Sequence, residues 1–376
     1  MTMNKPFVKT RWIVLIIVAM ILTACYLEDE ITRRSIEVSD YLVEENLKFD
    51  KFSNPQGIFT SDDSDVSSYS DALARRQLIT IRESGESSFV SYLEAGNPEG
   101  NPIILLHGTP SQAFLWRKVI PHLPQDARII APDLIGYGWS SKHDIDYSFK
   151  QHAAYLQAFI AALELVDDQG EAEKSLTFVA HDIGSIAMLA YASRFPGNIR
   201  GLVFFEAMLG PVPSFDVMPE AAQFFRSNTG QIAIMEDNLF MDGMMFSDAM
   251  SSHEFTQQEK AIYRLPFIKQ DSRNALAVVP REVPILGGAP DGFGDTNIEL
   301  LGRNAKFLMQ NPLPRLFIYA LPGVLIQENS VGVIEESFNP ENSLTITKLS
   351  GGKHFLQEDI PEELGDAIQQ WYENIN

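Results

Sequence analysis

The middle of the chain carries the segment Leu176-Thr177-Phe178-Val179-Ala180-His181-Asp182-Ile183-Gly184-Ser185-Ile186-Ala187-Met188-Leu189. Its apolar first half predicts a buried strand, and its second half, built from small and apolar residues, predicts a helix. Between them lies a turn in which Ala180 and Gly184 flank Asp182. A strand, a sharp turn with small residues and a helix are typical of a nucleophile elbow, which presents one side chain at the tip of the turn. We therefore predict that Asp182 is a nucleophile.

The identity of this residue restricts the chemistry. A nucleophile elbow usually carries Ser, whose hydroxyl needs a base before it can attack, whereas the carboxylate of Asp is already ionised near neutral pH. A carboxylate that attacks an alkyl carbon forms an ester with it. Asp182 thus indicates a substrate with an sp3 carbon that bears a leaving group, rather than an ordinary ester or amide.

Alternating strand and helix patterns surround the elbow. Strands are expected at 77–81, 89–93, 103–106, 128–131, 176–179, 201–205, 316–319 and 344–347, and helices at 149–165, 185–192 and 361–372. Strands that alternate with helices indicate an α/β protein whose mostly parallel sheet is covered by helices on both faces. The chain of 376 residues is long enough for one such domain with an insertion. We assign residues 73–206 and 281–376 to this core.

The segment 207–280 interrupts the alternation and is rich in Phe and Met. It holds seven of the 12 Met of the chain, namely Met208, Met218, Met235, Met241, Met244, Met245 and Met250. We expect a helical cap with a core of its own. Because Met adapts to irregular shapes, the underside of the cap is expected to form an apolar pocket for a small apolar organic substrate.

A carboxylate nucleophile needs a base that activates water and an acid that orients the base. His354 follows the last predicted strand and precedes the last predicted helix, where an α/β-hydrolase fold places its His. Glu206 ends the strand that follows the elbow helix, and packing alone does not explain a carboxylate there. The alternative acid is Glu328, the first acidic residue after the next strand. We favour a catalytic triad of Asp182, His354 and Glu206.

Two backbone N–H groups are candidates for an oxyanion hole. One belongs to Ile183, directly after the nucleophile, and the other to Thr109 in His107-Gly108-Thr109-Pro110, which follows an apolar strand. Such donors stabilise the negative charge that develops when water attacks an ester. We therefore expect Thr109 and Ile183 to lie beside Asp182.

Several segments resemble the haloalkane dehalogenases, a family of the α/β-hydrolase fold, over about three quarters of the chain. They are Leu105-Leu106-His107-Gly108-Thr109-Pro110-Ser111, Leu115-Trp116-Arg117, Ile130-Ala131-Pro132-Asp133-Leu134-Ile135-Gly136-Tyr137-Gly138, His181-Asp182-Ile183-Gly184-Ser185, Tyr263-Arg264-Leu265-Pro266-Phe267, Pro280-Arg281-Glu282-Val283-Pro284-Ile285, Pro322-Gly323-Val324-Leu325-Ile326 and Leu356-Gln357-Glu358-Asp359. The resemblance implies that Asp182 displaces a halide and that water activated by His354 hydrolyses the alkyl ester. It also implies that Glu206 is the acid, and that neither a cofactor nor a metal is used.

The chain departs from the family at the site of the leaving halide. The family holds the halide with the N–H groups of an Asn, where this chain has Thr109, and of a Trp, where it has Ile183. A Thr hydroxyl can donate one hydrogen bond and an Ile side chain none. The departures predict weak dehalogenation or a different substrate.

Three alternatives to dehalogenation follow from these departures. An epoxide hydrolase would use the same Asp ester, with Tyr263 of the predicted cap assisting the leaving alkoxide. A cofactor-free, luciferase-like oxygenase and a binding protein without turnover are the other two.

The N-terminus has the features of a secretion signal. Lys5, Lys9 and Arg11 precede an apolar run of 11 residues, 12–22, which is too short to be a good transmembrane helix. Leu22-Thr23-Ala24-Cys25 then resembles a bacterial lipobox. We predict that residues 1–24 are removed and that Cys25 is lipidated. Residues 25–72 would form an acidic tether to a membrane on the extracytoplasmic side, at the periplasmic face or the cell surface.

The composition excludes an intrachain disulfide and argues against binding to a nucleic acid. Cys25 is the single Cys, so that no disulfide can form within the chain. The formal net charge is −21, and such a chain would be repelled by the phosphate backbone of a nucleic acid.

Overall fold

The computed structural model of the protein describes residues 76–83 and 86–375. The predicted signal peptide, the lipidation site at Cys25 and the acidic tether lie outside the described residues. Among the described residues, no helix combines the length and the apolar character needed to cross a membrane.

An eight-stranded sheet organises the described part of the chain. Its strands, in the order in which they lie side by side, are β1 (Arg76–Glu83), β2 (Glu86–Gly96), β4 (Arg128–Pro132), β3 (Pro102–Leu106), β5 (Leu176–Asp182), β6 (Ile199–Ala207), β7 (Arg315–Leu321) and β8 (Leu344–Ser350). β2 pairs antiparallel with β1 and β4, and all the other pairs are parallel. β3 and β5 are buried at every residue, which explains the unbroken apolar sequence of β3 and the mostly apolar sequence of β5 before His181. The predicted α/β-hydrolase fold is confirmed.

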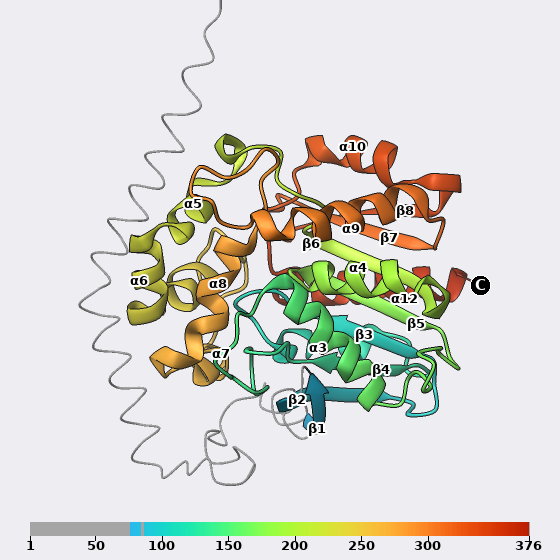
Figure 1. The fold of residues 1–376 in the computed structure, drawn as a ribbon. Helices are drawn as coiled ribbons and strands as arrows, with labels where there is room; N and C mark the ends of the chain where they lie inside the picture. Colours follow the sequence, from blue (N-terminus) through green and yellow to red (C-terminus); the bar gives the residue numbers. More distant parts are fainter. Residues whose placement is uncertain (1–75, 84–85, 376) are drawn as a thin grey trace, which may run out of the picture. The chain divides into compact units, whose positions relative to one another are not determined.

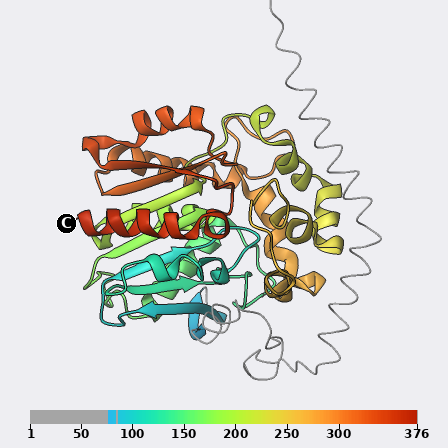
Figure 2. The same cartoon turned by 180° about the vertical axis from the view of Figure 1, so that it is seen from behind.

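Helices cover both faces of the sheet. Figure 1 shows α3 (Phe149–Ala162), α4 (Gly184–Arg194) and α9 (Ile298–Gln310) in front of the strands, and Figure 2 shows α12 (Pro361–Asn374) on the opposite face. α3 ends at Ala162, three residues before the predicted end at 165, because Leu163 leaves the helical conformation. α9 and α10 (Glu328–Phe338) were not among the predicted helices.

The segment between β6 and β7 contributes a group of short helices at one end of the sheet. These are α5 (Glu220–Arg226), α6 (Asn228–Asp237), η5 (Phe240–Met245), α7 (Gln257–Arg264) and α8 (Asn274–Glu282), of which Figure 1 labels the four α-helices. α7 begins with a capping box, in which the Thr256 hydroxyl and the Glu259 carboxylate each accept a backbone N–H. The chain then returns along the sheet through α9.

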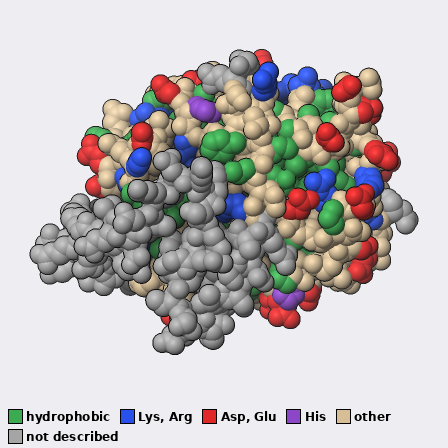
Figure 3. All heavy atoms as spheres, turned by 90° about the horizontal axis from the view of Figure 1, so that it is seen from below, with side chains coloured by type: hydrophobic (Ala, Val, Ile, Leu, Met, Phe, Trp, Pro, Cys, Tyr) green, Lys and Arg blue, Asp and Glu red, His purple; other side chains and the backbone are tan. Residues whose placement is uncertain are grey.

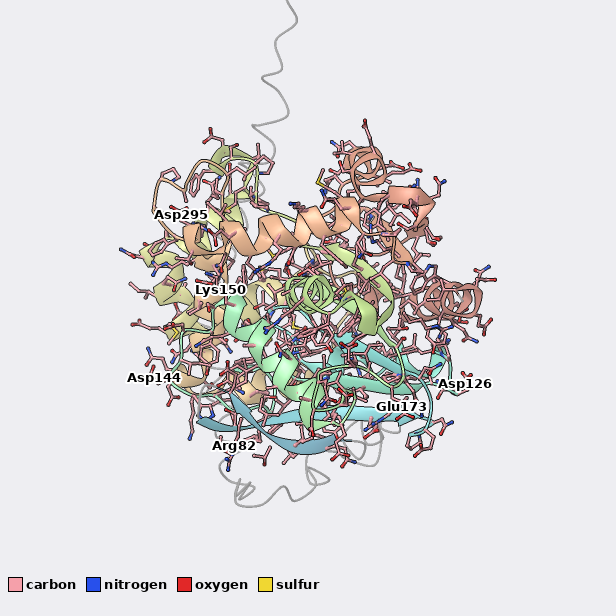
Figure 4. The ribbon with its side chains drawn as sticks, turned by 45° about the vertical axis from the view of Figure 1, so that its right-hand side comes forward. Arg82, Asp126, Asp144, Lys150, Glu173 and Asp295 are labelled. Carbon is pink, nitrogen blue, oxygen red and sulfur yellow. The ribbon has the colours of Figure 1, made fainter. Side chains whose placement is uncertain are left out.

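Charged side chains are distributed over the surface of the described residues. On the face drawn in Figure 3, acidic and basic side chains are interspersed, and the basic ones do not merge into a continuous patch among the described residues visible there. Asp126, Asp144 and Glu173, labelled in Figure 4, are exposed at the periphery. This arrangement is typical of a solvated surface.

Candidate active site

Asp182 lies at the tip of a sharp turn between β5 and α4. Its φ of 50° is in the left-handed region, which a non-Gly residue rarely adopts and which is often found at functional sites. Two glycines allow the close packing around it. A Cβ at Gly108 would lie 2.3 Å from Asp182 Cβ, and one at Gly184 would lie 2.6 Å from the His107 carbonyl oxygen. The turn therefore requires glycine at both positions.

Two backbone N–H groups face the Asp182 carboxylate. Thr109 N–H donates to Asp182 Oδ1 over 3.1 Å, and the N–H of Ile183 stabilises the same carboxylate. Burial raises the pKa of Asp182, while His354 and the two N–H groups oppose the rise. Thr109 and Ile183 thus lie beside Asp182, in the positions expected of oxyanion-hole donors.

His354 lies between Asp182 and Glu206. Its Nδ1–H donates to Glu206 Oε2 over 3.0 Å, and because a carboxylate only accepts, Nδ1 carries the proton. In the neutral ring, Nε2 is therefore an acceptor. Nε2 lies 3.8 Å from Asp182 Oδ2, beyond the length of a direct hydrogen bond, and remains able to accept a proton from water.

Glu206 is held firmly at the end of β6. Its carboxylate accepts hydrogen bonds from the backbone N–H groups of Val324 (3.1 Å), Leu325 (2.7 Å) and Ile326 (3.2 Å), in the turn after β7. Its φ of 44° is also in the left-handed region. Glu328, the alternative acid, is instead exposed at the start of α10 and pairs with Lys348. The structure thus brings Glu206 to His354 and places Glu328 elsewhere.

Two other buried His residues, His181 and His107, make hydrogen bonds to the backbone around the active site. His181 Nε2–H donates to the His354 carbonyl oxygen over 3.0 Å, and burial, followed by the proximity of His354, lowers its pKa well below the usual value, so that it stays neutral. His107 donates through Nδ1 to the Gly108 carbonyl and accepts the Leu134 N–H at Nε2. His107 supports its own turn, whereas His181 supports the loop that carries His354.

The Thr109 side chain has one partner in the described residues. Tyr137 O–H donates to Thr109 Oγ1 over 3.1 Å. Ile183 is buried at the first turn of α4 and brings no side-chain donor. Any side-chain hydrogen bond to a leaving group from these two positions has to come from Thr109.

Tyr263 does not project freely from the cap. Its hydroxyl donates to Glu358 Oε1, and the side chain is fully buried. Burial and the Glu358 charge raise its pKa well above the usual value. The Tyr263 hydroxyl, which an epoxide hydrolase would use, therefore already donates its hydrogen bond to Glu358.

Glu358 belongs to a buried ionic network. Arg117 binds both Glu259 and Glu358, and Lys118 Nζ lies 3.2 Å and 3.1 Å from the same two carboxylates. His253, Glu259 and Glu358 could each offer an atom to a metal, since their atoms lie within 4.8 Å of one another. Two cations already balance the two carboxylates, so the cluster is better suited to joining the cap to the core than to binding an ion.

Asp359 connects the cap to the loop of His354. Its Oδ1 accepts from Ser251 Oγ–H (2.5 Å) and from the N–H groups of Ser252 (2.7 Å) and His253 (3.0 Å), while its Oδ2 accepts from Lys353 N–H (2.8 Å). Sequence reasoning did not single out Asp359 or Tyr137. Both lie in segments of the family resemblance, which was the only signal that pointed to them.

Known proteins share this fold and much of the sequence. The model of the alpha/beta hydrolase fold matches residues 101–301. A haloalkane dehalogenase of Mesorhizobium japonicum is 33% identical over 300 residues, which cover 77% of this chain and 89% of that protein. Coelenterazine h 2-monooxygenase of Renilla reniformis is 31% identical to this chain. The matched region covers 77% of this chain and 88% of the monooxygenase. The crystal structure of a haloalkane dehalogenase from Bradyrhizobium elkani superposes with a TM-score of 0.70, at 29% identity, over 80% of this chain and 98% of the other.

Proposed function

This chain belongs to the haloalkane dehalogenase family of the α/β-hydrolase fold, and we propose that it is a hydrolase in which Asp182 forms an alkyl ester with its substrate. The substrate class is a small apolar molecule whose sp3 carbon bears a halide. The observation that carries the proposal is that the two oxygens of the Asp182 carboxylate have different neighbours. Oδ1 accepts a backbone N–H, whereas Oδ2 lies 3.8 Å from the base candidate.

The first step is a displacement at carbon. Asp182 Oδ2 forms a bond to the sp3 carbon while the carbon–halogen bond breaks, and the halide leaves with the bonding electrons. The carboxylate is already ionised, so that no base takes part in this step. Thr109 offers a hydroxyl donor to the departing anion, and Ile183 offers none.

The second step is hydrolysis of the ester. His354 Nε2 takes a proton from water as the water oxygen bonds to Asp182 Cγ. The resulting negative charge on Oδ1 is stabilised by the N–H groups of Thr109 and Ile183. The Cγ–Oδ2 bond then breaks, and the alcohol departs with the proton from His354. Glu206 stabilises the imidazolium that forms between these events.

A trapped ester would test this proposal. His354→Phe removes the base but not the nucleophile, so the alkyl ester should accumulate on the Asp182 peptide after incubation with a chloroalkane and bromoalkane panel. Mass spectrometry measures the added alkyl mass. His122→Phe is the matched control, because His122 lies on the helical turn 120–122 and faces Asp366, and it should turn over substrate without accumulation. An unmodified Asp182 peptide in His354→Phe, together with turnover in Asp182→Asn, would refute the proposal.

The same assay separates the alternatives. An adduct from epoxides but not from haloalkanes would assign the chain to epoxide hydrolysis. That outcome would require an acid other than Tyr263, since the Tyr263 hydroxyl donates to the fully buried Glu358 carboxylate. Oxygen consumption with an apolar heterocyclic substrate and no adduct would favour an oxygenase.

We also propose that the enzyme is held on a membrane through Cys25. The support is the sequence alone, namely the positive residues, the short apolar run and Leu22-Thr23-Ala24-Cys25. Several acyl chains on one residue, each contributing roughly 0.8 kcal/mol per buried CH₂, would anchor the chain stably. Cys25→Ala should block processing or release the protein from the membrane fraction. Unchanged processing and retention would count against lipidation.

A further inference from the structure

Tyr137 lies in a turn that fixes its position closely. Its neighbours Gly136 and Gly138 have φ values of 83° and 45°, in the region that favours glycine. A Cβ at Gly136 would lie 2.4 Å from the Tyr147 ring, and one at Gly138 would lie 2.3 Å from the Asp133 carboxyl carbon. The turn therefore holds Tyr137 against the core from both sides.

The Tyr137 ring is wedged among other aromatic rings. Its centroid lies 5.4 Å from that of His107, 5.8 Å from that of His152 and 6.2 Å from that of Phe267. The residue is fully buried, so that its hydroxyl has little freedom to move. That hydroxyl lies 3.1 Å from Thr109 Oγ1 and 3.4 Å from the Ala275 carbonyl oxygen in α8.

The hydroxyl protons can be accounted for one by one. Tyr137 has a single proton and two neighbouring acceptors, of which Thr109 Oγ1, at 3.1 Å, is nearer than the Ala275 carbonyl oxygen, at 3.4 Å; we assign the proton to the shorter contact. Thr109 then accepts from Tyr137, and its own hydroxyl proton cannot return along the same line. That proton is available to another acceptor, and the Thr109 backbone N–H, which donates to Asp182 Oδ1, places the residue beside the nucleophile.

We propose that Tyr137 is a positioning residue that directs the Thr109 hydroxyl proton toward the leaving halide, in place of the donor that Ile183 lacks. The inference rests on the proposed function and concerns its first step. Tyr137 forms and breaks no covalent bond. It transfers no proton, because a halide leaves as an anion and needs none.

The surroundings of Tyr137 favour this role over that of an acid. Burial raises its pKa far above the usual value, and the negative charge of Asp182 adds to the rise. The groups that face it from the packed elements are the neutral His107 and His152, the Thr109 hydroxyl and the Ala275 carbonyl. Tyr137 accordingly keeps its proton and acts as a hydrogen-bond donor.

A double-mutant cycle tests the inference. Tyr137→Phe removes only the hydroxyl, and Thr109→Val removes the hydroxyl of its partner with nearly the same shape. Stopped-flow measurement of adduct formation, under single-turnover conditions, isolates the first step. Tyr137→Phe should slow it about five- to tenfold with a chloroalkane, the size expected for one hydrogen bond, and less with the matching iodoalkane. In the Thr109→Val background it should have no further effect.

Two readouts exclude a merely structural role. Tyr147→Phe is the matched control, since Tyr147 packs against Gly136 and His152 but its hydroxyl donates to the His143 carbonyl. It should leave the chloride-to-iodide ratio of the rates unchanged. Adduct hydrolysis, the second step, should also be unchanged in Tyr137→Phe.

The outcomes distinguish the inference from the proposed function. Equal slowing by Tyr137→Phe in the wild-type enzyme and in the Thr109→Val variant would overturn the inference alone, and so would equal slowing with chloride and iodide. A wild-type enzyme that forms no adduct with any haloalkane would overturn the proposed function and the inference together.

Discussion

Glu206 Oε2 accepts the Nδ1–H of His354 at 3.0 Å, while the same carboxylate accepts three successive backbone N–H groups from 324–326. Four donors thus converge on two oxygens, an arrangement that fits an ionised carboxylate and no neutral side chain of this size. The acid that orients the base is thereby held in place by the backbone after β7.

Glu206→Gln should impair the second step far more than the first. An amide has one acceptor oxygen, so some of the four donors would lose their partner and the imidazolium would lose its stabilising charge. We expect hydrolysis of the ester to slow by about 10²–10⁴-fold and the adduct to accumulate. Rapid-quench mass spectrometry measures both steps. Glu328→Gln is the control, and a loss of hydrolysis there rather than in Glu206→Gln would transfer the role to Glu328.

The first step should depend on pH through the ionisation of Asp182. Burial raises the pKa of this carboxyl, and only the ionised form attacks. Adduct formation should therefore fall as the pH decreases, with a midpoint above the ordinary Asp value of 3.8. His354→Phe removes the strongest influence that lowers the pKa, so the midpoint should move to still higher pH. A midpoint that is identical with and without His354 would contradict this coupling.

The same shift predicts that the nucleophile destabilises the fold. A carboxyl whose pKa is higher in the folded than in the unfolded chain contributes most to stability below its unfolded pKa, and this contribution is lost as the pH rises through the folded pKa. Ionised Asp182 therefore costs stability at neutral pH. Asp182→Asn should raise the Tm at pH 7, and the gain should disappear below about pH 4, near the unfolded value. Calorimetry measures the difference at each pH, and a lower Tm for Asp182→Asn at pH 7 would contradict it.

Local patterns predicted the sheet and the elbow, because each strand and the turn at Asp182 are encoded by adjacent residues. The association of Glu206 with His354 is not encoded by adjacent residues, since 148 residues separate them, and Glu328 offered a second acid in the sequence. The bond from Tyr137 to Thr109 could not be predicted. It depends on how two glycines turn the chain and on which rings surround Tyr137, and neither is visible as a periodic pattern. α9, by contrast, buries Leu300, Leu301, Asn304 and Leu308 at helical spacing, so its pattern is readable in the sequence although the predicted helices did not include it.

A graft of donors would test whether the lack of side-chain donors at Thr109 and Ile183 limits the first step. Thr109 and Ile183 are both buried, and the Thr109 hydroxyl is the one side-chain donor that the two residues have. Thr109→Asn with Ile183→Trp adds an amide and an indole N–H. Because a preorganised donor at a developing anion contributes about 10²–10³ in rate, we expect a rise of that order in chloride release, measured with a chloride electrode. Thr109→Asn with Ile183→Phe is the control, since Phe adds the bulk without the N–H. An equal rise in both double variants would show that shape, rather than hydrogen bonding, limits the first step.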